Sequence, residues 1–461
     1  MFGTPAQSQD RMVVWQGDGL TVRSHFQGGI NLVSEGNLFW NFADTAAPGS
    51  GYDSDTNWAE FYIKPGLSFE NLLDGGDVFY GKLSGVVSYT MGTDAYAAGD
   101  TGRATLEEAY LGYRTTSANG TRFDFSLGPR ELKLGTGMLI ANGGSSGFER
   151  GALKFGPRKA WEMAAIAKLS QGGFTGTMFY IDPNENPSSD NDNRLAGLDL
   201  RFDGAGGGYQ GLTFVKVLKS GSPYVQAAAG GIGAPTILPG AREGTNALSY
   251  YGRTGKLGGG FENAFFALDM AYQWNDRVNL RAWAGRVQAG YTFTDLPWSP
   301  TLSYGFQTFS GDDPNTARLE RFDPLYYEGS PSSWATGSKS SMVFINSNVK
   351  AHNLTLRLKP SPKDTITFRY AHIRANELLS PIQFGQGTRV VLANGVPLVI
   401  SGVTGAHLAD DFFLEYSRII NRNTFLTAGV SLSKPGTGIT GAVGGSVPNW
   451  TGGFVNVVFN F

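Results

Sequence analysis

Cysteine is absent from the 461 residues, and charged residues are scarce. A chain without cysteine cannot be a disulfide-rich scaffold, and the absence suits a protein that crosses an oxidising periplasm. Charged residues make up 16% of the chain, against about 25% in an average soluble protein. The net charge of −2 and the pI of about 6.1 lack the basic excess of nucleic-acid-binding proteins, so we expect no nucleic-acid partner.

Long apolar runs are also missing. The most apolar stretch, residues 264–274, already contains Asp269, whereas a membrane-spanning helix needs about 20 predominantly apolar residues. This pattern excludes a helical membrane protein. The chain begins without a signal peptide, and we expect that Met1 and Phe2 stand where a signal was removed.

Glycine and aromatic residues are abundant instead. The chain contains 65 glycines, and aromatic residues make up 13% of it. Low charge combined with many aromatic and glycine residues is unusual for a soluble enzyme. It is typical of a barrel surface that is divided between lipid, aromatic belts at the two interfaces and long loops.

Apolar and polar residues alternate over segments longer than an average strand. In residues 20–32 the apolar side chains fall on one face and Arg23, His25 and Asn31 on the other. A tilted strand that crosses a bilayer needs about 9–11 residues, so this length fits a membrane strand. The same alternation recurs in residues 59–69, 122–128, 195–203, 353–359, 365–370 and 454–461. The final stretch predicts a strand that ends on Phe461 and closes a barrel against the first strand.

The connections between these segments have two lengths. Short turns are expected at 71–77, 116–120, 204–208, 294–300, 360–364 and 420–423. Long polar or glycine-rich loops are expected at about 33–57, 131–158, 219–244, 310–340 and 375–406. Short turns on one side and long loops on the other are typical of an outer-membrane barrel, whereas a soluble sandwich has short strands and turns every 8–12 residues.

We therefore predict an all-β fold: one transmembrane, antiparallel, up-and-down β-barrel domain over residues 1–461. The turns give 18 strands if residues 246–253 form a weak strand, and 16 if that strand and a neighbour are loop. The short turns are expected in the periplasm. The long loops are extracellular and are expected to fold over or into the pore and constrict it.

Three segments resemble the alginate-export family of bacterial outer-membrane porins. They are a strand with a Gly-Pro-Arg and Leu-x-x-Gly pattern (124–144), a strand leading into a Ser-Gly-Asp loop (302–327) and a near-terminal hairpin with a Pro-Gly exit (405–436). The resemblance implies an 18-stranded barrel with a lumen that is lined by basic residues and passes an anionic polysaccharide. The inward faces here carry both signs of charge, which departs from a strongly basic constriction.

The candidate site is the charged lumen. A Lys or Arg that faces lipid at mid-bilayer costs about 2–4 kcal/mol, so charges within the strands are expected to face inward. The basic residues that we expect to line the pore and bind the solute are Arg23, Lys64, Arg122, Arg130, Arg201, Arg357, Lys359 and Arg369. Guanidinium groups pair bidentately with carboxylates, which would favour anions. The alternative is that these residues pair with inward acids and only brace the barrel.

Nucleotide binding, catalysis and metal binding have less support in the sequence than a charged pore. No Gly-Lys-Ser/Thr motif follows a strand, so the glycine-rich stretches at 141–151 and 256–264 do not predict a nucleotide site. No Ser and His share an outward face at a two-residue spacing, and we predict no enzyme and no catalytic residues. We expect no cofactor, although the acidic loop at 188–193 could hold a calcium ion as an alternative to being simply exposed.

The predicted function is an outer-membrane channel in a Gram-negative bacterium that passes an anionic polysaccharide or uronate-type oligosaccharide. The alternative is an uptake porin for small organic anions or sugars. The expected partners are membrane lipid and lipopolysaccharide, the solute itself, and the barrel-assembly machinery, which would recognise the C-terminal strand. We expect a monomer.

Overall fold

The structure is a computed structural model. It describes residues 12–38, 53–96, 98–329, 333–338, 344–382, 389–394 and 396–461. The predicted loops at 33–57, 310–340 and 375–406 each lie partly outside the described residues. Among the described residues, no helix is long and apolar enough to cross a membrane.

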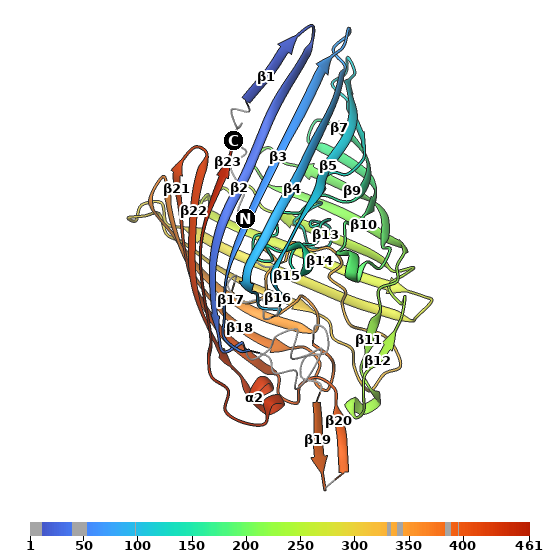
Figure 1. Cartoon of the computed structure of the whole chain (residues 1–461), viewed down its shortest axis with the longest axis vertical. Coiled ribbons are helices and arrows are strands. Elements are labelled where there is room, and N and C mark those ends of the chain that lie inside the picture. The colour runs from blue at the N-terminus through green and yellow to red at the C-terminus, as the bar shows by residue number, and fades with distance from the viewer. Residues whose placement is uncertain are drawn as a thin grey trace.

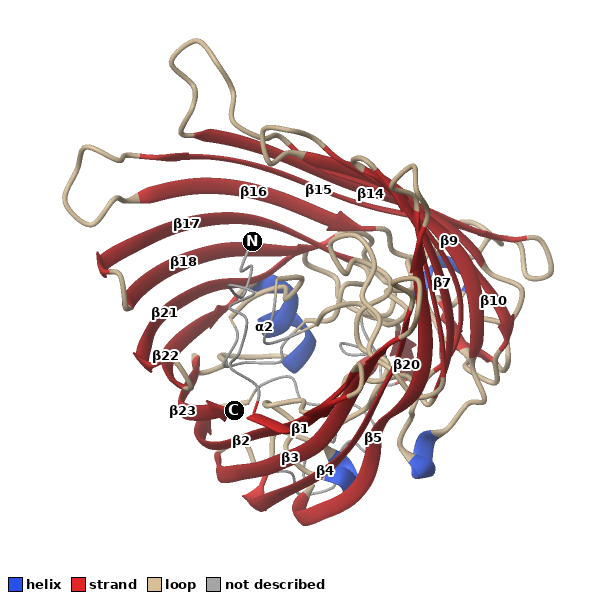
Figure 2. Cartoon of the chain, turned by 90° about the horizontal axis from the view of Figure 1, so that it is seen from above, coloured by secondary structure: helices blue, strands red, loops and turns tan. Residues whose placement is uncertain are grey.

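Long antiparallel strands form one closed sheet that surrounds a central space (Figures 1 and 2). The sheet has 19 strands, of which β1 (Met12–Gly17) is a short addition, and the other 18 form the barrel. These are β2 (Leu20–Gly36), β3 (Thr56–Leu72), β4 (Val78–Thr93), β5 (Gly99–Thr116), β6 (Arg122–Leu127), β7 (Met163–Gln171), β8 (Phe174–Asp182), β9 (Arg194–Asp203), β10 (Tyr209–Lys219), β13 (Asn246–Arg253), β14 (Ala264–Asn275), β15 (Leu280–Thr292), β16 (Thr301–Phe309), β17 (Val349–Ser361), β18 (Asp364–Ala375), β21 (His407–Asn421), β22 (Thr424–Pro435) and β23 (Trp450–Asn460). The count of 18 is confirmed over 16.

The last strand closes the barrel against the first long one. Strand β23 pairs with β2 from Gln27 to Gly36, with Ile30 opposite Val457. The pairing continues to the end of the chain, because Phe26 and Phe461 exchange two backbone hydrogen bonds of 3.0 and 2.7 Å. Beyond that point β1 pairs with the free part of the same edge of β2. The pairing that closes the barrel therefore continues to the last residue of the chain, Phe461.

The polarity of the barrel is inverted relative to a soluble protein. On β2, Ile30 and Leu32 are 46% and 57% exposed, whereas Asn31 between them is 2% exposed. The same holds on later strands, where Phe368 and Phe412 are exposed on the outside. Apolar side chains outside and polar ones buried inside suit a wall that faces lipid, which excludes the soluble sandwich.

The two ends of the barrel differ as expected. The predicted short turns join consecutive strands at one end, and the weak strand at 246–253 is β13. The same end also contains the turn between β7 and β8 and the longer connection between β13 and β14, which the sequence did not indicate. Figure 1 shows this end at the top; we call it the periplasmic end, as predicted from its short turns, and the other end the extracellular one.

Several short elements lie within the loops at the other end. They are the 3₁₀ helices at Phe148–Arg150, Pro187–Ser189 and Ala229–Gly231, the hairpins β11 (Tyr224–Gln226)–β12 (Thr236–Leu238) and β19 (Arg389–Ala393)–β20 (Val396–Ile400), and helix α2 (Thr437–Val443). Two predicted loops, 219–244 and 375–406, thus contain a hairpin each. The predicted loop at 33–57 begins later, because β2 continues to Gly36.

Candidate functional site

Two long connections lie inside the barrel (Figure 2). One is the β6–β7 loop (residues 128–162), and the other is the β16–β17 loop, described over 310–329, 333–338 and 344–348. They meet where the backbone of Ile140 pairs with that of Tyr326, and where the N–H of Ala141 donates to the carbonyl of Tyr326 at 2.8 Å. The ring of Trp161 packs edge-on against Tyr326, with 5.3 Å between centroids. The two loops thus form one apolar unit within a polar wall.

Glu60 of β3 fixes the β6–β7 loop to the wall. Its carboxylate accepts the backbone N–H groups of Lys154 at 2.8 Å and Phe155 at 2.9 Å. It also accepts the indole N–H of Trp58 and the amide of Asn31. The carboxylate is fully buried. A buried acid in the strand therefore acts as the hydrogen-bond acceptor for a loop that brings unpaired backbone donors into the lumen.

Lys154 of the same loop makes a buried ion pair. Its ammonium lies 2.9 Å from the carboxylate of Glu35, which also accepts the indole N–H of Trp450 at 2.7 Å. Burial lowers the pKa of Lys154 to about 7.

We call Glu60 the first anchor of the β6–β7 loop, meaning a wall residue that holds the loop in the lumen. A β-bulge in β5 supplies a second anchor. The pairing of β4 with β5 shifts between Ser84 and Gly85, and the extra residue places Glu107 and Glu108 on the same, inner side, where both are buried. Glu107 accepts the backbone N–H groups of residues 159 and 160 at 2.8 and 3.2 Å.

The predicted Lys64 lies between two acids at this anchor. It is 2.9 Å from Glu107 and 3.0 Å from Glu131 of the loop. Desolvation acts to raise the pKa of Glu131, but the ammonium groups of Lys64, Lys82 and Lys159 together lower it. Lys64 therefore links the loop to the wall.

A third anchor lies across the lumen. The hydroxyl of Thr136 donates to Asp269 of β14 at 2.5 Å, and Asp269 pairs with Arg286 of β15 at 3.0 Å. The guanidinium of Arg286 lies 3.5 Å from the ring centre of Trp334, whose indole N–H donates to the carbonyl of Thr136. The β6–β7 loop thus spans the barrel from β3–β5 to β14–β15.

Several of the eight predicted residues have acidic partners. Arg23 lies 3.3 Å from Glu70, Arg122 lies 3.6 Å from Asp124, and Arg201 lies 2.7 Å from Asp203. With Lys64, four of the eight make ion pairs, which is the geometry of the bracing alternative. Their role in binding a solute stays a prediction.

The remaining predicted residues are spread around the wall. Arg357 and Lys359 lie on the inner side of β17, and Arg369 of β18 lies between the register positions of Asp411 and Glu415 on β21. Arg130 follows β6, on a different part of the barrel. The structure therefore does not gather the eight residues at one constriction.

A row of arginines over aromatic rings lines the periplasmic half of one side. We define the arginine–aromatic row by four pairs: Arg114 over Tyr80 at 5.6 Å, Arg130 over Tyr110 at 4.4 Å, Arg201 over Tyr209 at 4.5 Å and Arg253 over Phe265 at 4.0 Å. In the part of the chain that the structure describes, Arg130 and Arg253 have no carboxylate within 4.0 Å. The sequence did not single out Arg253, because its strand was weak, or the aromatic partners, because their inward direction depends on register.

The expected calcium loop gains no support. The carboxylate of Asp192 pairs with Arg194 at 3.0 Å and with Lys219. Among the described residues, one group of side chains has the spacing of metal ligands, and it lies elsewhere, at His372, His407 and Asp410.

Solved structures with a similar fold are outer-membrane proteins. Acinetobacter baumannii OccAB2 is 10% identical, with a TM-score of 0.55 over 97% of this chain and 99% of that one. OccAB1 of the same organism is 11% identical, with a TM-score of 0.55 over 95% and 97%. Pseudomonas aeruginosa OpdL is 9% identical, with a TM-score of 0.54 over 95% and 98%. At these identities the likeness shows the fold alone. No curated protein sequence matches the chain.

The closed barrel of 18 strands, with its lipid-facing exterior and polar interior, defines a porin-like channel of the bacterial outer membrane. The model of the alginate export family matches residues 79–451. The chain belongs to the alginate export family, as the sequence motifs predicted. As a member of a channel family it is not an enzyme, which was also predicted.

Proposed function

We propose that this channel passes an anionic saccharide of the uronate type, and that the arginine–aromatic row is the surface along which the solute moves. The row is the observation that carries the proposal. A guanidinium binds a carboxylate through two parallel hydrogen bonds, and an aromatic ring beside it offers an apolar face for a sugar ring. Several such pairs around the wall would let a chain of acidic sugars pass from one pair to the next.

The β6–β7 loop would set the width of the pathway in this proposal. It crosses the barrel between the Glu60 anchor and the Asp269 anchor, and its apolar residues Leu139 and Trp161 are almost fully buried. A solute would have to pass beside this loop, between it and the wall that carries the row. Of the eight basic residues predicted from the sequence, Arg130 and Arg201 belong to the row and would contact the solute in this proposal.

A second candidate is an uptake porin for small organic anions. The observation that favours it is how much of the interior the loops fill, since Trp161 and Trp334 are both fully buried inside the barrel. A narrow path suits a monomer better than a polymer. The two candidates share the arginine–aromatic row and differ in the length of the solute that can pass.

The test is single-channel recording of the purified protein in a planar bilayer. We expect an anion-selective reversal potential under a salt gradient and a concentration-dependent block by uronate oligomers. Arg130→Gln and Arg253→Gln should each lower the anion preference and weaken the block. Arg418→Gln, on the outer face of β21 and paired with Asp364 at 3.0 Å, removes the same charge outside the lumen and should change neither.

The recordings distinguish the uronate channel from the small-anion porin. Block by monomeric uronate with no effect of oligomers would favour the small-anion porin. A weakly selective conductance that none of the variants changes would reject both, and would assign the row to a structural role.

A further inference from the structure

Three of the four histidines lie at the extracellular end of neighbouring strands, on the outer face of the barrel. His352 is on β17, His372 on β18 and His407 at the start of β21. His372 shares its face with Phe368, which is 46% exposed toward the lipid side. Asp410 shares the outer face with Phe412. This group plays no part in the lumen.

A second bulge brings His407 and Asp410 together. Residues three apart on a regular strand point to opposite faces. The pairing of β18 with β21 shifts between Ile373 and Arg374, so that Ile373 is opposite Ala409 and Arg374 is opposite His407. The extra residue, Leu408, is fully buried, as is Ala409. His407 is thereby turned to the same outer face as Asp410.

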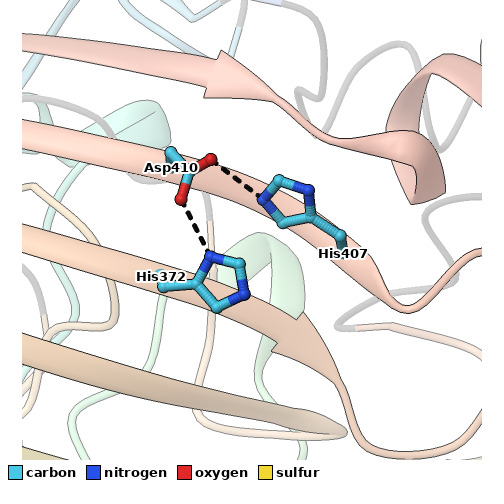
Figure 3. A group of neighbouring side chains, drawn as sticks. All are labelled: His372, His407 and Asp410. Atoms are coloured by element: carbon cyan, nitrogen blue, oxygen red, sulfur yellow. Dashed lines mark hydrogen bonds and ion pairs between the residues drawn. The ribbon is translucent and has the colours of Figure 1, made fainter.

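The three side chains have the geometry of a metal site (Figure 3). The Nδ1 of His372 lies 2.8 Å from Oδ1 of Asp410, and the Nε2 of His407 lies 3.2 Å from Oδ2. One ligand atom from each residue lies within 4.8 Å of the others. The two imidazole rings stack at 4.6 Å, so both nitrogens point toward the same carboxylate.

Two further contacts favour a bound ion. The Nε2 of His407 is shielded from solvent and faces Oδ2 of Asp410 at 3.2 Å without making a hydrogen bond, so an ion placed between the two atoms would satisfy both. The hydroxyl of Tyr370 donates to Oδ1 of Asp410 at 2.8 Å. A hydrogen bond of this kind holds a ligating carboxylate in place and is typical of the shell around metal ligands.

The neighbouring charges limit the ion that fits. Lys434 is opposite Asp410 in the register, and Arg374 is opposite His407. These cations weaken the binding of any metal, so hard ions that depend on charge, such as Ca²⁺, are disfavoured. Two imidazoles and one carboxylate are ligands that Zn²⁺ and similar transition metals prefer, with the fourth position left for another ligand.

We propose that His372, His407 and Asp410 bind one divalent transition-metal ion of the Zn²⁺ class at the extracellular rim, on the outer face. The ion would lie between the two imidazole nitrogens and the carboxylate, and the basic neighbours would favour an anionic group in its open position. The site joins β18 to the beginning of β21, where a long loop returns to the barrel. It does not depend on which solute the channel passes.

The test uses the full chain in detergent micelles. Titration calorimetry with ZnCl₂ at pH 7.5 should give one site per chain, and Co²⁺ should give the absorption spectrum of a four-coordinate ion. His407→Asn and His372→Asn should each weaken binding by at least about tenfold. His25→Asn is the matched control, since His25 lies on β2 and hydrogen-bonds to Ser68 of β3 at 2.7 Å, on strands that carry no member of the cluster.

Acidification offers a second readout, because protons compete with the metal for imidazole. Zn²⁺ binding should be lost at pH 5 and restored at pH 7.5. Each variant is first checked for heat-modifiable migration, which reports a folded barrel, so that loss of binding is not confused with loss of the fold. Failure of the wild-type chain to bind Zn²⁺ would overturn the proposal, as would unchanged binding in both His372→Asn and His407→Asn.

Discussion

Removing the carboxylate of Glu60 should release the β6–β7 loop from the wall while leaving the barrel intact. The change Glu60→Ala deletes the acceptor of four hydrogen bonds, two of which come from the backbone of residues 154 and 155. The strand itself keeps its pairing, since its ladder with β2 and β4 does not use this side chain. The effect should therefore fall on the loop.

The magnitude follows from the donors that lose their partner. A buried polar group that is left without a hydrogen bond costs about 1–3 kcal/mol, so the two backbone N–H groups together disfavour the inserted loop by about 2–6 kcal/mol. The lower value corresponds to a shift of roughly thirtyfold in the equilibrium between inserted and released loop. Glu60→Gln keeps one carbonyl oxygen for one of the two N–H groups, and its effect should be about half as large.

The assay is conductance in a planar bilayer, combined with limited proteolysis of the folded protein. We expect Glu60→Ala to show a larger and fluctuating conductance and faster cleavage within residues 128–162, with Glu60→Gln in between. Asp364→Ala is the control, because Asp364 pairs with Arg418 on the outer face of the barrel at 3.0 Å, outside the lumen. The reasoning fails if Glu60→Ala keeps the wild-type conductance and cleavage pattern, or if Asp364→Ala changes them equally.

Two further predictions concern the other anchors. Because burial lowers the pKa of Lys154 to about 7, the inserted loop binds fewer protons than the released loop between about pH 10 and pH 7. Insertion should weaken as the pH falls through that window and change no further below it, and Lys154→Met should abolish this dependence of the gating fluctuations. Asp269→Asn leaves Arg286 buried without its acidic partner, which costs about 3–5 kcal/mol. In gel electrophoresis, Asp269→Asn should lower the temperature at which the folded band is replaced by the unfolded band. Asp203→Asn, which removes the acid of an exposed ion pair, should leave that temperature nearly unchanged.

The barrel could be predicted from the sequence because the lipid face is a local property. Each strand residue either meets lipid or does not, so the alternation indicates the face on which each side chain lies, and the two loop lengths indicate the direction of the strands. Strand β1 was missed even though its signal was present. Asp18 and Gly19, both with positive φ, form the two-residue turn between β1 and β2, and Asp-Gly is a typical sequence for this kind of hairpin.

The candidate site could be predicted only in part, since its contacts depend on long-range approach. The alternation over residues 59–69 places Lys64, and Glu60 with it, on the polar inner face. It could not show that their partners are backbone and side-chain groups of a loop up to about 95 residues away. β-Bulges further limit the prediction of inward and outward faces from the alternation. At Glu107 and at Leu408 one extra residue reverses the face of its neighbours, so that a strict period of two gives the wrong side.

The charges on the inner wall divide by their position along the barrel. Glu35, Glu60 and Glu107 hold the inserted loop toward the extracellular side and the middle, and their negative charge is taken up by buried donors. The arginine–aromatic row lies in the periplasmic half, where Arg130 and Arg253 have no acidic partner among the described residues. The electrostatic field in the lumen is therefore neutralised in the extracellular half and positive in the periplasmic half, so it is asymmetric along the barrel axis. If the row conducts the solute, anion current should therefore depend on the direction of the applied voltage, and Arg130→Gln combined with Arg253→Gln should make it more symmetric.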